Sequence, residues 1–384
     1  MPQSSIPCCI YRGGTSRGLM FHDKDLPIDD AEKNRIFLEG IDAYNLSQVN
    51  GIGGSTSSTS KVCVISPPSV EGCHANWTFY QVGTGKAVVD SKGTCGNMMS
   101  AVGAFIIDEG LAKTNPNSET ATVYVYNTNI KRKLEIKIPL INGRARVSGN
   151  YAMPGVLHTG AMIEVAIVHP GGEMTGQQML LGHTTNISTP RKTYTTTFSD
   201  LINPFIFLAG ENFGLTGTEQ QIEVANNQPI IDELNLIRDK MAVAAGMAIN
   251  EQDAHDHKPN APKIAIIAPA QDYRTTSGTL IKKESVDILI KAVSMGKLHR
   301  TCPASGLYNL AAVALLENTV ANKITGIPPG TKEKMVRIGH PDGIVEVKVK
   351  LNENGTAIES VGMERTARRI VKGHLFIPPK QCTS

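Results

Sequence analysis

Short strand-like runs of apolar and β-branched or aromatic residues, bounded by turn residues, dominate the first half of the chain. Such runs are typical of β-strands, and together they predict a largely antiparallel sheet. The runs cover residues 62–65, 76–80, 121–126 and 134–138. Apolar residues at helical spacing are less frequent and predict helices over 30–38, 97–110 and 231–248. The pattern as a whole indicates an α+β fold.

The second half of the chain repeats this scheme. Strand patterns over 263–267 and 343–349 flank a helical pattern over 306–316. Residues 94–105 and 301–314 are also similar to each other, because each places a cysteine before small residues that open an apolar helix. Repeated segments of this kind predict a two-fold architecture.

The boundary between the two halves is expected in the polar stretch 182–190, where the periodicity stops and turn residues gather. We therefore predict an N-terminal domain over 1–184 and a C-terminal domain over 185–365. A last segment, 366–384, could return to the N-terminal domain.

Composition and charge exclude several classes of partner. The chain has 384 residues, 41% of them hydrophobic, which is enough for two cores. Its net charge is only +3 and aromatic residues make up 5%, so we expect no nucleic acid and no membrane as partner. There is no run of eighteen apolar residues and no signal-peptide pattern at Met1, so we expect a soluble, cytoplasmic protein with a small partner.

The seven cysteines are an odd number and are scattered, without a Cys-x-x-Cys pair or clustered histidines. This spacing argues against a disulfide framework and against a zinc site. We expect no metal and no cofactor. Most buried thiols are inert, so a cysteine needs a particular context to be a functional candidate.

Cys95 has such a context, because it stands just ahead of the predicted helix 97–110. The unpaired backbone N–H groups and the positive end of a helix favour a thiolate, and they also bind carboxylates. Proton transfer next to a carboxylate needs donors of this kind for the enolate that forms. A buried cysteine beside a helix cap is an equally open interpretation of the residue alone.

Lys61 ends the Gly/Ser/Thr-rich loop 51–61 and begins the apolar strand 62–65. A lysine that is partly removed from water there could supply a neutral amine as a general base. The loop lacks the Gly-x4-Gly-Lys-Ser/Thr pattern of a Walker motif. A solvated lysine at a strand end is the simpler alternative.

A candidate anion site precedes these residues at Arg12, Gly13, Gly14, Thr15 and Ser16. Arginine offers paired donors to a carboxylate, the glycines permit close approach of backbone N–H groups, and the hydroxyls add further donors. A turn with surface arginines is an equally open interpretation.

Several ordered motifs together resemble one known family. They are RGGTS at 12–16, SSTSK at 57–61, GTCGN at 93–97, RIGHP at 337–341 and RTARR at 365–369. Shorter matches lie at 172–176, 203–204, 214–217 and 376–378. Over nearly the whole chain the sequence resembles the PrpF family of 2-methylaconitate, 3-methylitaconate Δ- and aconitate Δ-isomerases.

The resemblance implies a diaminopimelate epimerase-like (PhzF-type) fold. In that fold two pseudo-symmetric domains each wrap a mainly antiparallel sheet around a central helix, and the active site lies in the cleft between the domains. It also implies that Lys61 and Cys95 are the catalytic pair of a cofactor-independent isomerase.

The implied reaction is an allylic 1,3-proton shift on a small di- or tricarboxylate such as 3-methylitaconate, aconitate or 2-methylaconitate. Lys61 or Cys95 would remove a proton and the other would return it at the far carbon. The implied substrate contacts are Arg12, Thr15, Ser16, Ser57, Gly96, Asn97, Ser305 and Gly306. A homo-oligomer, dimer or tetramer, is also expected, and a cis-trans isomerase is an alternative reaction type.

Cys302 departs from the family pattern, in which the second helix usually opens with a residue that is not a thiol. It keeps open a two-thiol racemase or epimerase that uses Cys95 and Cys302. Pro303 removes one N–H from that helix mouth, which makes it a poorer anion site. A carboxylate-binding protein without catalysis is the third alternative.

Overall fold

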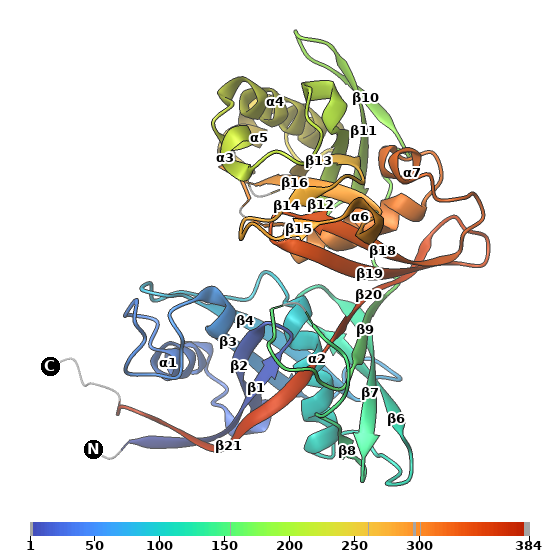
Figure 1. Cartoon of the computed structure of the whole chain (residues 1–384). Coiled ribbons are helices and arrows are strands. Elements are labelled where there is room, and N and C mark those ends of the chain that lie inside the picture. Colours follow the sequence, from blue (N-terminus) through green and yellow to red (C-terminus); the bar gives the residue numbers. More distant parts are fainter. Residues whose placement is uncertain (1–2, 154, 260, 295–296, 300, 380–384) are drawn as a thin grey trace, which may run out of the picture. The chain divides into compact units, whose positions relative to one another are not determined.

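The computed structural model describes residues 3–379, apart from 154, 260, 295–296 and 300 (Figure 1). Contacts divide the chain into unit 1, Met1–Ile167 with Glu364–Ser384, and unit 2, Val168–Met363. The sequence places these divisions after residues 184 and 365. Each unit is described by itself below.

Unit 1 is a mainly antiparallel sheet around one helix. Its strands pair in the order β21-β1-β2-β3-β4-β6-β7-β9, with β2–β3 and β4–β6 parallel. The elements are β1 (Ser4–Gly13), β2 (Ser16–His22), η1 (Asp23–Asp25), α1 (Asp30–Ile41), η2 (Ser57–Thr59), β3 (Lys61–Ser66), β4 (Ala75–Val82), β5 (Val89–Asp90), α2 (Gly96–Asp108), β6 (Thr120–Asn127), β7 (Arg132–Ile141), β8 (Arg144–Ala145), β9 (Ile163–Val168) and β21 (Ala367–Ile377).

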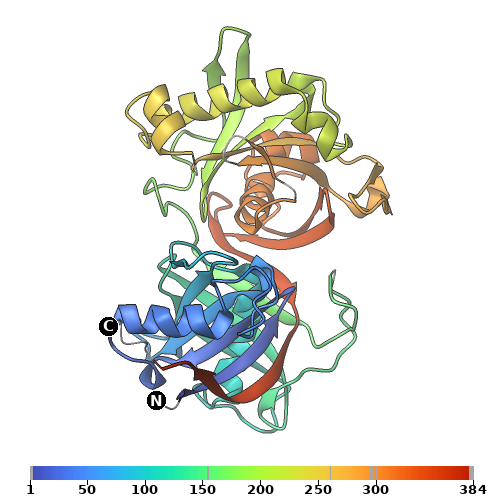
Figure 2. The ribbon, with the colours of Figure 1, turned by 90° about the vertical axis from the view of Figure 1, so that its left-hand side faces the viewer.

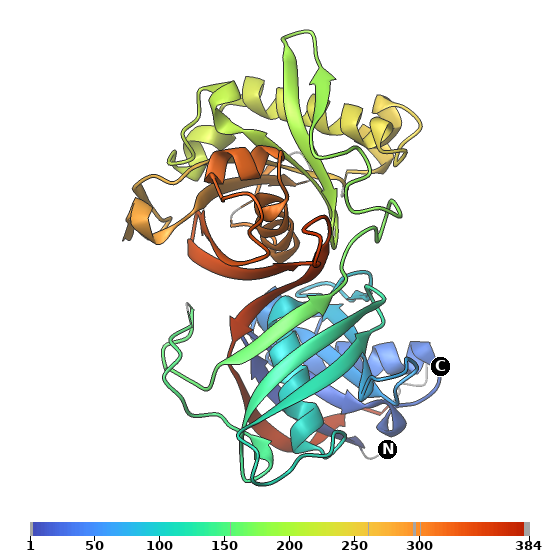
Figure 3. The ribbon, with the colours of Figure 1, turned by 90° about the vertical axis from the view of Figure 1, so that its right-hand side faces the viewer.

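The central helix α2 has no polar face. Its residues from Met98 to Ile107 are all buried, which requires that the sheet enclose the helix on every side. Figure 3 shows α2 lying across the inner face of β6 and β7, and α2 also contacts β1, β2 and β21. Gly103 permits this packing, because a Cβ there would lie 2.6 Å from Cγ2 of Ile136.

Unit 2 repeats this topology. Its strands pair in the order β10-β11-β12-β13-β16-β18-β19-β20, with β12–β13 and β16–β18 parallel. The elements are β10 (Thr185–Ser188), β11 (Thr193–Asp200), β12 (Pro204–Ala209), η3 (Gly210–Phe213), α3 (Gln221–Ala225), α4 (Gln228–Ala244), α5 (Glu251–His257), β13 (Lys263–Pro269), β14 (Tyr273–Arg274), β15 (Leu280–Ile281), η4 (Lys283–Ser285), β16 (Ile288–Ser294), β17 (Lys297–Leu298), α6 (Ala304–Leu315), α7 (Val320–Thr325), β18 (Glu333–His340), β19 (Gly343–Leu351) and β20 (Ile358–Arg365).

Strand for strand, β11-β12-β13-β16-β18-β19-β20 reproduces β1-β2-β3-β4-β6-β7-β9, including which pairs are parallel. Helix α6 takes the place of α2, and its residues from Gly306 to Leu315 are likewise all buried. Figure 2 shows α6 enclosed by the curved sheet of its unit. The predicted α+β class and the wrapped central helices are confirmed.

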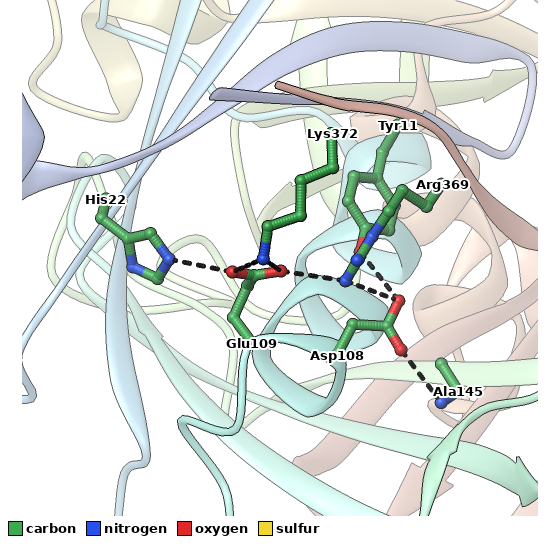
Figure 4. Close-up of polar contacts among 7 residues, drawn as sticks. All are labelled: Tyr11, His22, Asp108, Glu109, Ala145, Arg369 and Lys372. Atoms are coloured by element: carbon green, nitrogen blue, oxygen red, sulfur yellow. Dashed lines mark hydrogen bonds and ion pairs between the residues drawn. The ribbon is translucent and has the colours of Figure 1, made fainter. Parts of the chain in front are cut away.

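A cluster of hydrogen bonds and ion pairs joins the C-terminal strand β21 to the rest of unit 1 (Figure 4). Arg369 donates from Nε to the Tyr11 hydroxyl at 2.6 Å, and Tyr11 donates to Oδ2 of Asp108 at 2.8 Å. Nη2 of Arg369 also pairs with Oε1 of Glu109 at 3.0 Å, and Nζ of Lys372 lies 2.8 Å from Oε2 of Glu109. The C-terminal end of α2 is thus tied to β1 and β21.

Glu109 is ionised at the centre of this cluster. Burial opposes its ionisation, but hydrogen bonding and charge from Lys372, with the charge of Arg369 and a hydrogen bond from His22, outweigh burial and hold the pKa below the ordinary 4.5. A carboxyl whose pKa is lower in the folded chain stabilises the fold above its unfolded pKa. That contribution is lost as the pH falls from about 4.5 through the lowered value.

We expect Glu109→Gln to lower the free energy of unfolding by about 1–3 kcal/mol at pH 7, because two cations lose their acceptor. Melting temperatures between pH 7 and pH 3 test this, with the exposed Glu71→Gln as control. The gap between wild type and Glu109→Gln should shrink as the pH falls below 4.5. A gap that stays constant with pH would contradict the ionic role of Glu109.

Candidate active site

Cys95 is the N-cap of α2, with φ −125° and ψ 105°. Within the described residues its side chain makes no capping hydrogen bond, and the thiol is only partly buried. Gly96 and Asn97 follow as the first two residues of the helix. The thiol therefore stands at the positive end of a buried apolar helix, as the sequence predicts.

Hydroxyl and amide groups surround this thiol. Ser16 begins β2 and is buried, and its Oγ lies 3.9 Å from Sγ of Cys95. Nδ2 of Asn97 donates to Oγ1 of Thr15 at 3.0 Å and to Oγ of Ser16 at 3.5 Å. Oδ1 of Asn97 accepts from Nε of Arg365 at 3.0 Å. Thr15, Ser16, Cys95 and Asn97 thus form one cluster within unit 1.

The turn between β1 and β2 approaches α2 so closely that two glycines are required. A Cβ at Gly13 would lie 2.6 Å from the backbone oxygen of Asn97. Gly14 has φ +53°, and a Cβ there would lie 2.3 Å from Oδ1 of Asn97. A backbone with positive φ and no room for a side chain favours glycine. These glycines bring the hydroxyls of the following residues to the thiol.

Lys61 is the first residue of β3 and is only 8% exposed. Its Nζ donates to Oε1 of Gln81 at 2.7 Å and lies 5.2 Å above the ring centre of Phe79. Gln81 stands directly opposite Lys61 on β4. Within the described residues, no carboxylate pairs with this ammonium.

Gln81 has only one possible orientation. Its Nε2 donates to the backbone oxygens of Ser57, Ser60 and Val82 at 2.9–3.1 Å, so its Oε1 must face Lys61. Gln81 cannot be identified from the sequence alone, because its importance depends on the register of β3 and β4. The strand pattern of residues 76–80, directly before it, was the one available signal.

Cys63 lies on β3, the strand that begins with the predicted catalytic residue Lys61. It follows Lys61 by two residues on β3, so both side chains lie on the same face of the strand. Burial raises the pKa of the Cys63 thiol, and the charges of Cys95 and Lys61 also act on it. Lys61 pairs with Gly18 of β2, and Ser16, two residues earlier on β2, lies beside the Cys95 thiol, so Lys61 and Cys95 lie in the same region of unit 1.

Other predicted residues have different surroundings. Nη1 of Arg12 donates to the backbone oxygens of Gly14 and Thr366 at 2.9 and 3.0 Å, which holds the glycine turn. Ser57 is exposed on η2, and its backbone oxygen is bound to Gln81. Ser305 and Gly306 lie in the first turn of α6, in unit 2. Substrate contacts by these residues stay predictions.

Unit 2 carries a lysine and a cysteine at equivalent positions. Lys263 begins β13 as Lys61 begins β3, and its Nζ lies 5.9 Å from the ring centre of Phe205. Cys302 precedes α6, but it is 7% exposed and its thiol donates to the backbone oxygen of Pro303 at 3.6 Å. Burial raises the pKa of the Cys302 thiol, and the charge of Lys263 opposes this only in part.

The described residues contain neither a metal-binding cluster nor a membrane-crossing helix. No group of three or more His, Cys, Asp and Glu residues there could hold a metal ion. No helix in the described part of the chain is long and apolar enough to cross a membrane.

The chain is similar in sequence and in structure to known proteins. The chain is 32% identical to "3-methylitaconate isomerase" of Eubacterium barkeri and 31% identical to "2-methyl-aconitate isomerase" of Shewanella oneidensis, with 98% of both chains covered in each case. The crystal structure of methylitaconate-delta-isomerase superposes with a TM-score of 0.90 at 31% identity, covering 98% of this chain and 96% of that one.

The fold and the relatives define an isomerase, so the predicted enzyme class is confirmed. Residues 3–378 match the family described as "PrpF protein". The chain belongs to the PrpF family.

Gln81→Leu should lower the isomerase kcat on the order of 10²-fold, because a displacement of about 1 Å in a reacting group can cost that much. The variant removes the acceptor that fixes the Lys61 ammonium. Steady-state kinetics test this, with the exposed Gln177→Leu as control and melting temperatures as a check on folding. A wild-type kcat in Gln81→Leu would show that Lys61 needs no fixed partner.

Proposed function

We propose that this protein moves a carbon–carbon double bond in an unsaturated di- or tricarboxylic acid by an allylic 1,3-proton shift. The observation that carries this proposal is the buried Lys61 ammonium, held by Gln81, in the same region of unit 1 as the Cys95 thiol. A proton shift needs one group that removes a proton and a second that supplies one. Lys61 and Cys95 can exchange these roles.

In one direction the Cys95 thiolate takes a proton from the carbon next to the double bond. The electron pair of the broken C–H bond enters the conjugated system and gives a dienolate. The Lys61 ammonium then donates a proton to the far carbon, and the double bond stands one position along. In the reverse direction the Lys61 amine removes the proton and the Cys95 thiol supplies one. A forward turnover leaves the thiol protonated and the amine neutral, so one proton must return from Cys95 to Lys61 through solvent before the next turnover, and no electron is gained or lost overall.

The substrate carboxylates would bind around the start of α2. Backbone N–H groups of Gly96 and Asn97 suit the developing negative charge of the dienolate. The hydroxyls of Thr15 and Ser16 lie beside these N–H groups and would also donate hydrogen bonds to a substrate carboxylate. Arg12, Ser57, Ser305 and Gly306 stay predicted contacts whose roles the tests below do not require.

The relatives suggest which acids to test. 3-Methylitaconate and 2-methylaconitate are named for two of them, and aconitate differs from 2-methylaconitate by one methyl group. One methyl group changes the preference of an apolar pocket only about 10–200-fold. All three acids therefore belong in the first assay.

Lys61→Ala and Cys95→Ser should each lower kcat by about 10²–10⁴-fold, the usual contribution of a general acid or base. Proton NMR of each acid follows the double bond, and deuterated water shows where the new hydrogen enters. The exposed Lys92→Ala and the partly buried Cys73→Ser are matched controls. Full activity in both site variants, or binding without turnover in the wild type, would contradict the proposal.

The two-thiol racemase is the second candidate, and the surroundings of Cys302 weigh against it. A thiol that is buried and donates to a carbonyl is protonated and is a poor base. We expect Cys302→Ser to keep kcat within about threefold of wild type, because a small polar replacement leaves the proposed pair unchanged. Steady-state assays beside Cys95→Ser measure this. Equal losses in the Cys302 and Cys95 variants would favour the racemase.

A further inference from the structure

Arg365 contacts the candidate active site, although no role has been assigned to it. It is the last residue of β20, where the chain returns to unit 1. Its Nε donates to Oδ1 of Asn97 at 3.0 Å, and its Nη1 donates to the backbone oxygen of Glu364 at 2.8 Å. Asn97 and Arg365 are 268 residues apart in the sequence.

The guanidinium decides which way the Asn97 amide faces. Arginine can only donate hydrogen bonds, so the amide oxygen of Asn97 must face Arg365. The amide nitrogen then faces the hydroxyls of Thr15 and Ser16 and donates to both. Without the arginine, the amide could turn and accept from these hydroxyls instead.

The orientation of the Asn97 amide in turn determines which atom the Ser16 hydroxyl can donate to. Because the Ser16 oxygen accepts from Asn97, its hydrogen stays available for another acceptor. Sγ of Cys95, 3.9 Å away, is an acceptor when the thiol is ionised. A hydroxyl donating to the thiolate stabilises it, since hydrogen bonds to charged groups are the stronger ones.

Close packing holds this chain of contacts in place. The backbone N–H of Gly14 donates to the oxygen of Thr366 at 2.9 Å, next to Arg365. Oγ of Ser100 donates to the backbone oxygen of Asn97 at 2.9 Å. Asn97 also lies against Gly14, where a side chain could not fit. Packing therefore holds the side chain in place but permits either flip of the nearly isosteric amide, and the hydrogen bond from Arg365 selects between the two flips.

We propose that Arg365 is a positioning residue for the Cys95 thiolate. It acts through Asn97 and Ser16. Arg365 orients the Asn97 amide, the amide donates to the Ser16 oxygen, and the Ser16 hydrogen is then free to bond to the Cys95 sulfur. The arginine touches neither the thiol nor the reacting carbons in this role. The inference rests on the proposed role of Cys95, but its test does not need a substrate.

The test is the alkylation of Cys95 by iodoacetamide between pH 6 and pH 10, followed by mass spectrometry of the Cys95 peptide. Arg365→Met should slow the reaction at pH 7 roughly tenfold and move the rate profile to higher pH, because the thiolate loses a charge-assisted hydrogen bond. In the isomerase assay kcat should fall while KM changes less than about twofold.

Three further variants separate positioning from charge and from folding. Arg368→Met removes a positive charge from an exposed neighbour on β21 and should keep the wild-type profile. Arg365→Lys keeps one donor for Oδ1 of Asn97 and should restore part of the rate. Asn97→Asp keeps a partner for Arg365 but cannot donate to Ser16, so it should behave like Arg365→Met.

The outcomes are distinct. A wild-type alkylation profile in Arg365→Met, or an equal change in Arg368→Met, overturns the inference. A raised KM with unchanged alkylation also overturns it, because Arg365 would then bind the substrate directly. If Arg365→Met does not fold, Arg365→Lys and Asn97→Asp decide. An inactive wild type whose alkylation depends on Arg365 would sink the proposed reaction and leave the inference standing.

Discussion

The burial of one entirely apolar helix is the constraint on which unit 1 depends. Because α2 buries every residue from Met98 to Ile107, strands must surround it on all sides. The sheet can do so only if β21 returns from the end of the chain to pair with β1. That return brings Thr366 and Arg365 to the glycine turn at the start of the helix. The polar contacts around Cys95 are therefore assembled by the same packing that encloses α2.

The two ends of α2 have different polar surroundings. At its C-terminal end Asp108 and Glu109 bind Arg369 and hold the returning strand. At its N-terminal end the partly buried Cys95 thiol lies beside neutral hydroxyls and the Asn97 amide, whose oxygen accepts from Arg365. Strong ion pairs would compete with a bound carboxylate there. Their place at the far end of the helix is consistent with the proposed binding of an anionic substrate at the start of α2.

The sequence predicted the elements well and the long-range contacts poorly. The helix expected over 97–110 is α2 at Gly96–Asp108, and the strand expected over 62–65 is β3 at Lys61–Ser66. Local periodicity determines such elements, so they can be read without a structure. Gln81 and Arg365 escaped prediction, because the first depends on strand register and the second on a contact across 268 residues. Periodicity indicates which face of a strand a residue lies on, but it does not identify the residue's partner on another strand.

The internal repeat allows the surroundings of the lysine and cysteine in the two units to be compared position by position. Lys61 and Lys263 begin equivalent strands, and Cys95 and Cys302 precede equivalent helices. In unit 1 Gln81 fixes the ammonium and a serine hydroxyl lies beside a partly exposed thiol. In unit 2 the thiol is buried and bound to a carbonyl, and Pro303 removes one donor from the helix start. The same backbone thus holds two lysine–cysteine pairs, and the polar groups around them support the proposal that the first pair exchanges protons.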